Sequence, residues 1–458
     1  MVSFGTAGVR GSVVDRVTPT VALAVGGAVG RLVSETASAS TPSVVVGRDG
    51  RTSGPALAAA VEAGIAAAGC RPVRIGAIPT PTLAFASRGR HGVMLTASHN
   101  PPTDNGIKLF ADGSEFDSDQ EAIIEQYVQD SAPPTAWDQW KTPTRSHPLG
   151  AYQEAVVEYS RGVGADPDDL RVAVDCGTGM ASVATPQVLG ELGASVTAVN
   201  ATVDGHFPAR PSKPTPETLA EFRALLADGA FDLGIAHDGD ADRIVLVDGD
   251  GEIVHEDTVL AILASYYTRQ YVSDAGDDAA EPVVITTPNA SGRIDEQVAA
   301  AGGRIERVRL GSLHEGIAGA EAPVVFAAEP WKHIHPAFGG WIDGIASAAV
   351  LTRLVAAEGL AGLQEPITER PYRKESVDCP DDRKRTAMDE LETSLPEQFP
   401  EASVSLDHGV RLAFDDGSWL LVRPSGTEPY VRLYAESEDV DRLVEVATVA
   451  IESAVDGE

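Results

Sequence analysis

The 458-residue chain contains only three cysteines, Cys70, Cys176 and Cys379, which lie far apart in the sequence. Such a small, odd number argues against a disulfide framework and favours reduced, buried thiols. The most apolar early stretch, residues 21–33, is too short and too rich in glycine to span a bilayer. The N-terminus has neither a charged n-region nor a cleavage signal. We therefore expect a cytoplasmic protein that has no membrane partner.

Positive charge is also scarce, because 35 Lys and Arg residues stand against 68 Asp and Glu residues, which gives a formal net charge of −33. Lysine is much rarer than arginine, and the acidic residues are spread along the chain, so they do not form an acidic tail. This sign of charge argues against nucleic acid and anionic membranes as partners. An acidic, lysine-poor composition is typical of proteins that work in molar salt, where the Debye length is about 3 Å. We therefore expect a halophilic source.

The order of predicted elements indicates four domains. Short β-branched runs alternate with longer Ala- and Leu-rich runs, and this rhythm of a mostly parallel sheet starts near Ser43, Arg171 and Pro282. After residue 371 the pattern changes to closely spaced strands at 410–414, 419–423 and 430–436. The sequence thus predicts three related three-layer α/β domains and a C-terminal α+β domain with an antiparallel sheet. The expected ranges are 1–147, 148–252, 253–366 and 367–458.

Three aspartates follow the predicted strand 232–236 at every second position, namely Asp238, Asp240 and Asp242. Alternate residues of an extended segment point the same way, so three carboxylates would crowd together unless a cation lies between them. Oxygen ligands suit Mg²⁺ or Ca²⁺. An EF-hand is excluded, because its sixth and twelfth positions hold Arg243 and Gly249 here. The alternative interpretation is an acidic surface turn, against which the small spacers Gly239 and Ala241 argue.

A second segment, Thr-Ala-Ser-His-Asn-Pro-Pro at residues 96–102, also follows a predicted strand. The Asn-Pro-Pro run enforces a turn, which presents Ser98 on a rigid loop. A serine nucleophile in a hydrolase is one interpretation, but neighbours in sequence seldom face each other and the G-x-S-x-G elbow is absent. A serine followed by histidine is also common by chance. Lys108, a few residues on, is close enough to fold back over the same loop.

A third segment, Arg-Pro-Ser-Gly-Thr-Glu-Pro at residues 423–429, joins two predicted strands. One guanidinium, two hydroxyls and a glycine that permits close backbone approach suit a phosphate monoester. Arg432 could add a second cation. A plain hairpin turn is the alternative. The glycine- and arginine-bearing segments 4–11 and 47–51 match neither a Walker A loop nor a dinucleotide fingerprint, and each is weak alone.

Taken together and in this order, the segments 5–11, 96–101, 238–243 and 423–429 resemble the motifs of the α-D-phosphohexomutase superfamily, over essentially the whole chain. This superfamily includes phosphoglucomutases, phosphomannomutases and phosphoglucosamine mutases. The resemblance implies four domains around a central cleft, a sugar-phosphate substrate, one Mg²⁺ per chain and a sugar bisphosphate as activator. It implies a phosphoryl group on Ser98, with one of its oxygens completing the Mg²⁺ site of Asp238, Asp240 and Asp242.

The resemblance also assigns the remaining site residues. The transfer site would contain, besides Ser98, the side chains of Arg10, His99, Lys108 and Arg243. The phosphate that does not react would be held by Arg423, Ser425, Gly426, Thr427 and Arg432. Glu329 and His333 match the glutamate and histidine of the sugar-reading motif G-E-x-S-G-H.

The sugar-reading motif is where the chain departs from the family, because Trp331 replaces the serine and Lys332 replaces the glycine. Trp331 could stack on a sugar ring or merely fill the loop. For His333 and His335, packing or a loop hydrogen bond is favoured over a zinc site. The Glu-Pro-Trp-Lys run resembles archaeal members assigned to glucosamine phosphate, so the prediction leans to that sugar. Phosphomannomutase or phosphoglucomutase activity is the alternative, and a metal-dependent sugar phosphatase or a non-catalytic sugar-phosphate-binding protein are further ones.

Overall fold

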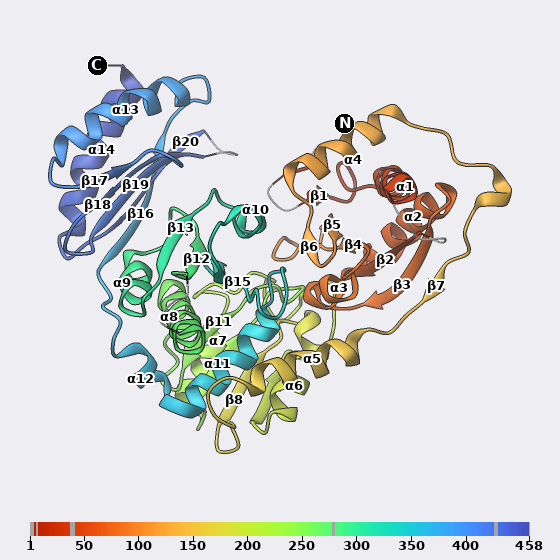
Figure 1. Ribbon diagram of the computed structural model, residues 1–458, viewed down its shortest axis with the longest axis horizontal. Coiled ribbons are helices and arrows are strands. Elements are labelled where there is room, and N and C mark those ends of the chain that lie inside the picture. Colours follow the sequence, from red (N-terminus) through yellow and green to blue (C-terminus); the bar gives the residue numbers. More distant parts are fainter. Residues whose placement is uncertain (1–3, 6–7, 37–41, 277–279, 426–428, 458) are drawn as a thin grey trace. The chain divides into compact units, whose positions relative to one another are not determined.

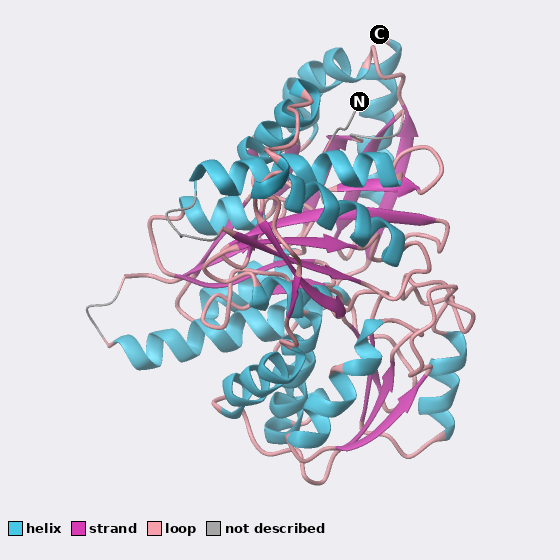
Figure 2. Ribbon diagram, turned by 90° about the vertical axis from the view of Figure 1, so that its right-hand side faces the viewer, coloured by secondary structure: helices cyan, strands magenta, loops and turns pink. Residues whose placement is uncertain are grey.

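The computed structural model describes residues 4–5, 8–36, 42–276, 280–425 and 429–457 (Figure 1). The contacts within the chain divide it into two compact units. Unit 1 comprises Met1–Glu256 and Trp331–Leu363, and unit 2 comprises Asp257–Pro330 and Gln364–Glu458. In both units helices pack beside the sheets (Figure 2). None of the helices in the described ranges combines the length and apolar character needed to cross a bilayer. The four predicted domain ranges stay a prediction.

The first sheet of unit 1 has the strand order β1-β5-β4-β2-β3-β7, with β6 beside β5. Strands β4, β2, β3 and β7 are parallel, and β1, β5 and β6 pair antiparallel. The strands are β1 (Val9–Ser12), β2 (Ser43–Arg48), β3 (Arg71–Ala77), β4 (His91–Leu95), β5 (Asp104–Ala111), β6 (Ser114–Glu115) and β7 (Thr144–Arg145). The helices are α1 (Pro19–Thr36), α2 (Gly54–Ala67), α3 (Thr80–Ala86), α4 (Ser118–Asp130) and the 3₁₀ turn η1 (Trp137–Gln139).

Alternation along β2 explains how this sheet is covered on both faces. Val44 and Val46 belong to the core that contains buried residues of α1, α2 and α4, whereas Val45 belongs to the core beneath α3. Successive side chains of a strand point to opposite faces, so an uninterrupted valine run suits a strand that is buried on both sides. The layers α1-α2-α4, sheet and α3 therefore form a three-layer α/β arrangement.

The second sheet of unit 1 has the order β11-β10-β8-β9, in which only β11 is antiparallel. Its strands are β8 (Arg171–Asp175), β9 (Ser195–Val199), β10 (Leu233–Ala236) and β11 (Val245–Asp248). The other elements of unit 1 are α5 (Leu149–Arg161), η2 (Met180–Val183), α6 (Thr185–Glu191), α7 (Ala220–Asp228), β15 (Lys332–Ile334), α11 (Gly344–Glu358) and most of α12 (Leu360–Gln364). Because β8 and β10 are parallel, the loops after Asp175 and Ala236 leave the same edge of the sheet, where open α/β sheets bind ligands.

Unit 2 contains a parallel sheet with the order β13-β12-β14 and an antiparallel sheet with the order β16-β20-β19-β18-β17. The parallel part comprises α8 (Glu256–Ala275), β12 (Val283–Thr286), α9 (Gly292–Ala300), β13 (Arg304–Arg307), α10 (Leu313–Gly319) and β14 (Val324–Glu329). The antiparallel part comprises β16 (Tyr372–Asp378), α13 (Lys384–Gln398), β17 (Ser403–Ser405), β18 (Val410–Ala413), β19 (Trp419–Pro424), β20 (Tyr430–Glu436) and α14 (Val440–Asp456). Residues of α14 at helical spacing, including Leu443, Ala447 and Ile451, are buried against this sheet.

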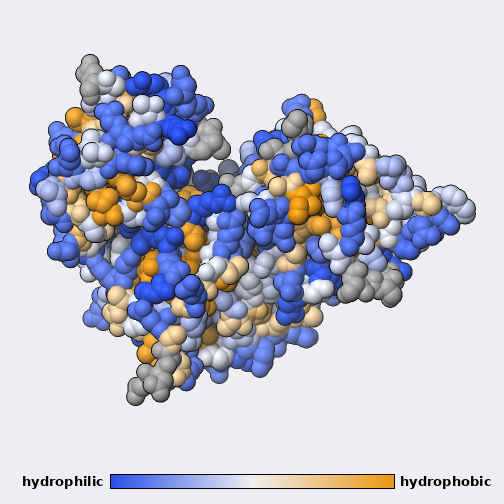
Figure 3. Space-filling model, turned by 45° about the horizontal axis from the view of Figure 1, so that its top comes forward, coloured by the Kyte–Doolittle hydropathy of each residue, from blue (hydrophilic) through white to orange (hydrophobic). Residues whose placement is uncertain are grey.

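The predicted fold class is confirmed: three groups of α/β elements with mostly parallel strands precede an α+β part with an antiparallel sheet. The last residues of the first expected range, 1–147, include the short strand β7, which pairs with β3 in the first sheet. Hydrophilic residues predominate on the face shown in Figure 3, and apolar residues there form small groups, as a net charge of −33 leads one to expect.

Candidate active site

Ser98 lies in the loop between the antiparallel strands β4 and β5, and the residue is fully buried. Its backbone is left-handed, with φ 50°, a conformation that non-glycine residues adopt rarely. The Ser98 N–H donates to Thr96 Oγ1 at 2.9 Å. The Ser98 hydroxyl donates to Asp238 Oδ2 at 2.5 Å, and Asp242 Oδ1 lies 3.5 Å away. The loop and the aspartates, which are 140 residues apart in sequence, therefore meet in one place.

The three aspartates lie in the loop that leaves β10, and all three are buried. Each can offer one oxygen such that the three oxygens lie within 4.8 Å of one another. The expectation of an extended segment is wrong, because residues 239–242 form turns and bends and Ala241 has φ 62°. The carboxylates converge because the chain bends around a common point, rather than because alternate residues of a strand face one way.

Two side chains fix the shape of this loop. Thr80, at the start of α3, donates its hydroxyl to Asp240 Oδ2 at 2.5 Å and its N–H to the Asp240 carbonyl at 3.0 Å. The ring of His237 contacts the Arg243 carbonyl at 2.7 Å through Nδ1 and Thr185 Oγ1 at 3.0 Å through Nε2. Burial lowers the pKa of His237 to about 4, so the ring is neutral at physiological pH. Thr80 thus holds the middle of the loop, and the ring of His237 joins its beginning to its end.

The charges of the cluster fit a divalent cation. Burial, and then the charges of Asp242 and Asp240, raise the pKa of Asp238 well above its usual range, and burial and Asp242 raise the pKa of Asp240. Burial acts in the same direction on Asp242, but the neighbouring cations outweigh it and hold the pKa of this carboxyl well below its usual range. Asp240 Oδ1 is buried and accepts no hydrogen bond. An acceptor-only oxygen in this position, with two more carboxylates beside it, suits Mg²⁺.

Four cations surround the cluster. Lys108 Nζ, on β5, lies 3.0 Å from Asp242 Oδ2 and 3.3 Å from Glu115 Oε1. Burial favours the neutral amine, but these two carboxylates keep the pKa of Lys108 above its usual value. Arg243 Nε lies 3.7 Å from Asp238 Oδ2 and 3.9 Å from Asp242 Oδ1. The other two cations are Arg10, on β1, and Lys332, on β15, both close enough to perturb His99.

His99 differs from these residues because its ring is neutral. Its Nδ1 lies 3.3 Å from Ser98 Oγ. Burial, and then the charges of Arg243 and Arg10, lower the pKa of His99 to about 2. The imidazole can therefore exchange hydrogen bonds beside the Ser98 hydroxyl, but it does not add positive charge there.

Gly239 allows two loops to approach each other closely. One is the loop between β10 and β11 that carries the three aspartates (residues 237–244, the metal loop), and the other is the loop between β4 and β5 that carries Ser98 (residues 96–103, the Ser98 loop). A Cβ at this position would lie 2.7 Å from the Ser98 carbonyl oxygen and 3.1 Å from Cζ of Phe207. We expect Gly239→Ala to separate the two loops and to lower kcat by about 10²-fold, because small displacements of reacting groups are costly. Gly190→Ala is the matched control, since a Cβ there meets nothing within 4 Å. Steady-state kinetics on both variants checks this, and equal activities would contradict the close approach.

The residues of the predicted sugar-reading motif fall on both units. In unit 2, Glu329 accepts a hydrogen bond from the N–H of Gly311. In unit 1, Trp331 has φ 69°, is partly buried against the core of the second sheet, and has Lys213 Nζ 5.9 Å from its ring centroid. Ile244 N donates to the Trp331 carbonyl, and Lys332 forms a β-bridge with Arg243. Trp331 and Lys332 therefore lie beside Arg243 and Ile244, the residues that directly follow the three aspartates.

The two histidines of this segment behave as packing residues. His333 Nδ1 and His335 Nε2 lie 3.0 Å and 2.9 Å from the same Ser347 hydroxyl, which itself donates to the Asp343 carbonyl. Both rings are buried, and burial lowers the pKa of each to about 3. Among the described residues, the only group of three or more candidate metal ligands is the aspartate triplet. The hydrogen bonds of both rings to Ser347 agree with the predicted role of His333 and His335 in packing and loop hydrogen bonding.

The predicted phosphate-binding residues lie in unit 2, at the ends of β19 and β20. Arg423 and Arg432 are directly opposite each other in the β19–β20 register, and each donates to a tyrosine hydroxyl at 3.1 Å. Ser425 is buried, and Lys384 Nζ donates to its carbonyl at 2.7 Å. Gly426 and Thr427 lie outside the described residues. Two guanidiniums side by side suit a phosphate group.

Two residues at the site, Thr80 and Arg51, could not be predicted from the sequence. Thr80 bonds an aspartate 160 positions away, and Arg51 bonds carbonyls of the Ser98 loop about 50 positions away. The sequence pattern around Thr80 or Arg51 does not indicate contacts with residues so far away. The arginine-rich segment 47–51 was the one available signal for Arg51, and it matched no phosphate-binding motif.

Comparison with known proteins agrees with this architecture. Models of the phosphoglucomutase/phosphomannomutase family match the chain three times: alpha/beta/alpha domain I over residues 1–134, alpha/beta/alpha domain II over 151–251 and the C-terminal domain over 377–452. A phosphoglucomutase/phosphomannomutase family protein from Burkholderia thailandensis has a solved structure that is 24% identical, with a TM-score of 0.86, and covers 99% of this chain and 98% of its own. At this identity the likeness shows the fold.

Two archaeal relatives are more similar in sequence. The phosphopentomutase of Thermococcus kodakarensis is 40% identical over 456 residues, 98% of this chain and 96% of the relative. A probable phosphoglucosamine mutase of Methanopyrus kandleri is 40% identical over 453 residues, 97% of this chain and 95% of the relative. With such identity over almost its full length, the chain belongs to the α-D-phosphohexomutase superfamily and is an isomerase of the intramolecular phosphotransferase class.

Proposed function

We propose that the chain interconverts the 6-phosphate and the 1-phosphate of a hexose by way of a phosphoserine at Ser98. The observation that carries the proposal is the 2.5 Å contact between the Ser98 hydroxyl and Asp238, within a group of three buried carboxylates. A serine hydrolase commonly uses a histidine as its base, whereas burial and the charges of Arg243 and Arg10 lower the pKa of the nearest imidazole, His99, to about 2, which makes it a weak base. A carboxylate cluster with surrounding cations instead suits a phosphoryl group and its metal ion.

Asp238, Asp240, Asp242 and one oxygen on Ser98 are the groups that would hold Mg²⁺. When bound, the ion neutralises charge on the oxygens of the phosphoryl group during transfer. Arg243 and Lys108 lie within 4 Å of the same carboxylates, so they supply further positive charge where the phosphoryl group would sit. Arg10 adds to this charge, and the neutral ring of His99 offers a hydrogen-bonding nitrogen beside Ser98.

The transfer balances as two displacements. A sugar hydroxyl attacks the phosphorus of phosphoserine, and the new P–O bond forms as the Ser98 Oγ–P bond breaks. The proton of the sugar hydroxyl passes overall to Ser98 Oγ, and the sugar becomes a bisphosphate. After the bisphosphate turns round, Ser98 Oγ attacks its other phosphate and the isomeric monophosphate leaves. A free sugar bisphosphate should therefore activate the unphosphorylated enzyme.

Binding of the rest of the substrate is assigned by resemblance to the family. Arg423, Ser425 and Arg432, with Gly426 and Thr427, would hold the phosphate that does not react, and its binding energy would orient the reacting hydroxyl. Glu329 would accept hydrogen bonds from sugar hydroxyls. His333 is the second residue of the sugar-reading motif that the resemblance assigns to substrate binding. Trp331 is partly buried against the core of the second sheet, so filling the loop is the better supported of its two predicted roles.

The sugar has two candidates. Glucosamine 6-phosphate is the first, and the name of the Methanopyrus kandleri relative supports it. A pentose phosphate is the second, because an equally identical relative from Thermococcus kodakarensis is a phosphopentomutase. Both candidates use the same transfer chemistry and differ only in the sugar that is bound.

A coupled assay in high KCl with Mg²⁺ and a sugar bisphosphate tests the proposal. The panel comprises the 6-phosphates of glucosamine, glucose and mannose and the 5-phosphate of ribose. We expect kcat/KM to be highest for glucosamine 6-phosphate; a higher value for ribose 5-phosphate would establish the second candidate. The inorganic phosphate released should remain small compared with isomerised product. Steady phosphate release without an isomer would instead indicate a sugar phosphatase, and binding without either product a non-catalytic protein.

A further inference from the structure

Arg51, in the loop between β2 and α2, is a fully buried guanidinium directed at the Ser98 loop. Its Nε lies 3.0 Å from Asp49 Oδ2. Its two terminal nitrogens donate at 2.6–3.0 Å to the backbone carbonyl oxygens of Ser98, Asn100, Pro101 and Asp104. All five N–H groups of a guanidinium point outward in one plane, so a single side chain can bind this many acceptors.

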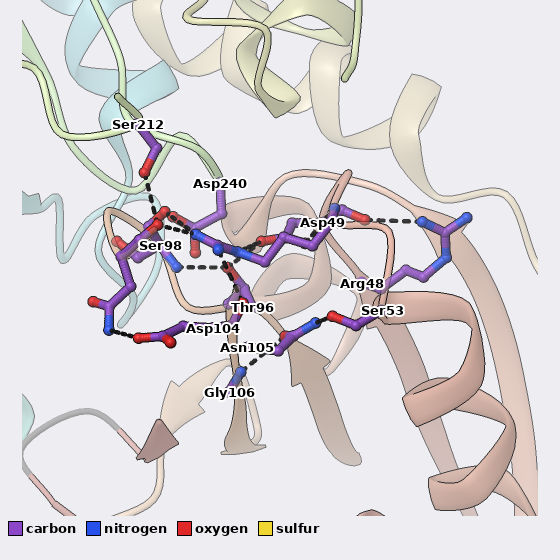
Figure 4. A network of polar contacts seen from close by, with 12 residues as sticks. Arg48, Asp49, Ser53, Thr96, Ser98, Asp104, Asn105, Gly106, Ser212 and Asp240 are labelled. Atoms are coloured by element: carbon purple, nitrogen blue, oxygen red, sulfur yellow. Dashed lines mark hydrogen bonds and ion pairs between the residues drawn. The ribbon is translucent and has the colours of Figure 1, made fainter. Parts of the chain in front are cut away.

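Asp49 connects the same guanidinium to the backbone of Ser98 by a second route. Its Oδ1 accepts from the Arg51 N–H at 2.9 Å, and its Oδ2 accepts from Thr96 Oγ1 at 2.8 Å. Thr96 Oγ1 in turn accepts the Ser98 N–H at 2.9 Å. Figure 4 shows Asp49, Thr96 and Ser98 converging in this network. Both the N–H and the C=O of Ser98 are therefore fixed by the Asp49–Arg51 pair.

The Ser98 backbone requires such support. A serine at φ 50° is in a disfavoured conformation that persists only when surrounding contacts determine it. The bond from Arg51 to the Ser98 carbonyl is buried, whereas the bonds to the other three carbonyls are partly buried. Loss of the guanidinium would therefore leave a buried acceptor at Ser98 without its partner, which is costly. The ring of Phe207, whose centroid is 5.1 Å from Arg51 Cζ, covers the guanidinium. Ser212 adds one more bond to the loop, to the Asn100 carbonyl at 3.1 Å (Figure 4).

We propose that Arg51 and Asp49 are positioning residues, which hold the Ser98 loop so that Oγ lies in line for phosphoryl transfer. This rests on the function proposed above. Both side chains are fully buried and bond to the Ser98 loop, so the pair acts through Ser98 and not on the sugar. Loss of the pair should therefore lower kcat and the rate of Ser98 phosphorylation, while KM for the sugar phosphate changes little.

The test compares Arg51→Lys and Arg51→Ala with Arg48→Lys. Arg48 belongs to the same segment, but it is only half-buried and bonds only the Asp49 carbonyl. A lysine ammonium cannot reproduce a planar fork of donors, so we expect kcat of Arg51→Lys to fall by about 10²-fold, with KM within about threefold of wild type. We expect Arg48→Lys to keep wild-type kcat. Millimolar guanidinium should restore part of the activity of Arg51→Ala, whereas urea at the same concentration should not.

Phosphorylation of Ser98 by a sugar bisphosphate, followed by mass spectrometry of the Ser98 peptide, separates the two proposals. If the wild-type serine is never phosphorylated, the proposed function fails. If it is phosphorylated and Arg51→Lys reacts as fast as wild type, only the positioning role is overturned. Should the Arg51 variants not fold, Thr96→Val, which removes only the hydroxyl between Asp49 and Ser98, replaces them. Wild-type kcat in folded Thr96→Val would overturn the role, and a loss of kcat at unchanged KM would support it.

Discussion

Replacing Ser98 with alanine is expected to abolish turnover, with a loss of at least about 10⁴-fold in kcat, as for other nucleophiles that form a covalent intermediate. The proposed reaction stores the phosphate on this oxygen between two half-reactions, so no other group can take its place. The Ser98 peptide should carry no phosphate after incubation with a sugar bisphosphate. A coupled assay and mass spectrometry measure the two effects.

Folding should survive this substitution, because the side chain removed is small and the loop is held by backbone bonds to Arg51 and Thr96. The matched control is Ser160→Ala: Ser160 is also fully buried, and its hydroxyl donates only to the Val157 carbonyl in its own helix. Both variants should keep thermal midpoints near that of wild type, and Ser160→Ala should keep full activity. Turnover by a folded Ser98→Ala protein would refute the phosphoserine.

Much of the site could be predicted from the sequence, because its residues follow predicted strands directly. Ser98 comes after β4 and the aspartates after β10, and strand ends can be read from apolar runs. Spacing alone did not show that these loops meet; the resemblance to a family supplied that expectation. The contact between Ser98 Oγ and Asp238 confirms that the two loops meet.

The conformation of the metal loop could not be predicted from its spacing. An alternation of aspartates indicates a common face only if the segment is a strand, and residues 239–242 turn instead. The bend depends on Ala241 at positive φ and on Thr80, whose hydrogen bonds come from another sheet's covering helix. No local propensity encodes such a contact.

Strand β16 is an element of the fold that likewise could not be predicted from the sequence pattern. Its residues alternate weakly in burial, and most of Tyr372–Asp378 is exposed, so the sequence carries no period-two apolar signal there. The strand exists because all seven residues pair with β20. By contrast, the buried residues Leu443, Ala447 and Ile451 of α14 recur at helical spacing, which is a pattern that can be read from the sequence.

Replacing Asp240 with asparagine is expected to lower the activity of the protein and to raise the stability of its metal-free form. With Mg²⁺ present, Asp240→Asn should lower kcat by at least about 10²-fold, since it weakens the ion's ligand set. In EDTA the same variant should be more stable than wild type, because three carboxylates then lie within 4.8 Å with no ion between them. Wild type should gain stability with Mg²⁺, by about 2.7 kcal/mol at a hundredfold excess over Kd, and the variant should gain little.

Differential scanning fluorimetry in EDTA and in a Mg²⁺ series measures these shifts, and the same series with Ca²⁺ tests the choice of ion. Asp228→Asn is the control, because it changes the net charge equally at an exposed position outside the cluster. A gain of stability in EDTA shared by both variants would reflect general charge repulsion and contradict the prediction. An unchanged response of Asp240→Asn to Mg²⁺ would mean that the ion binds elsewhere. The buried Asp240 Oδ1 favours the expected result, since this oxygen accepts no hydrogen bond from the described residues and can serve as a ligand for a cation.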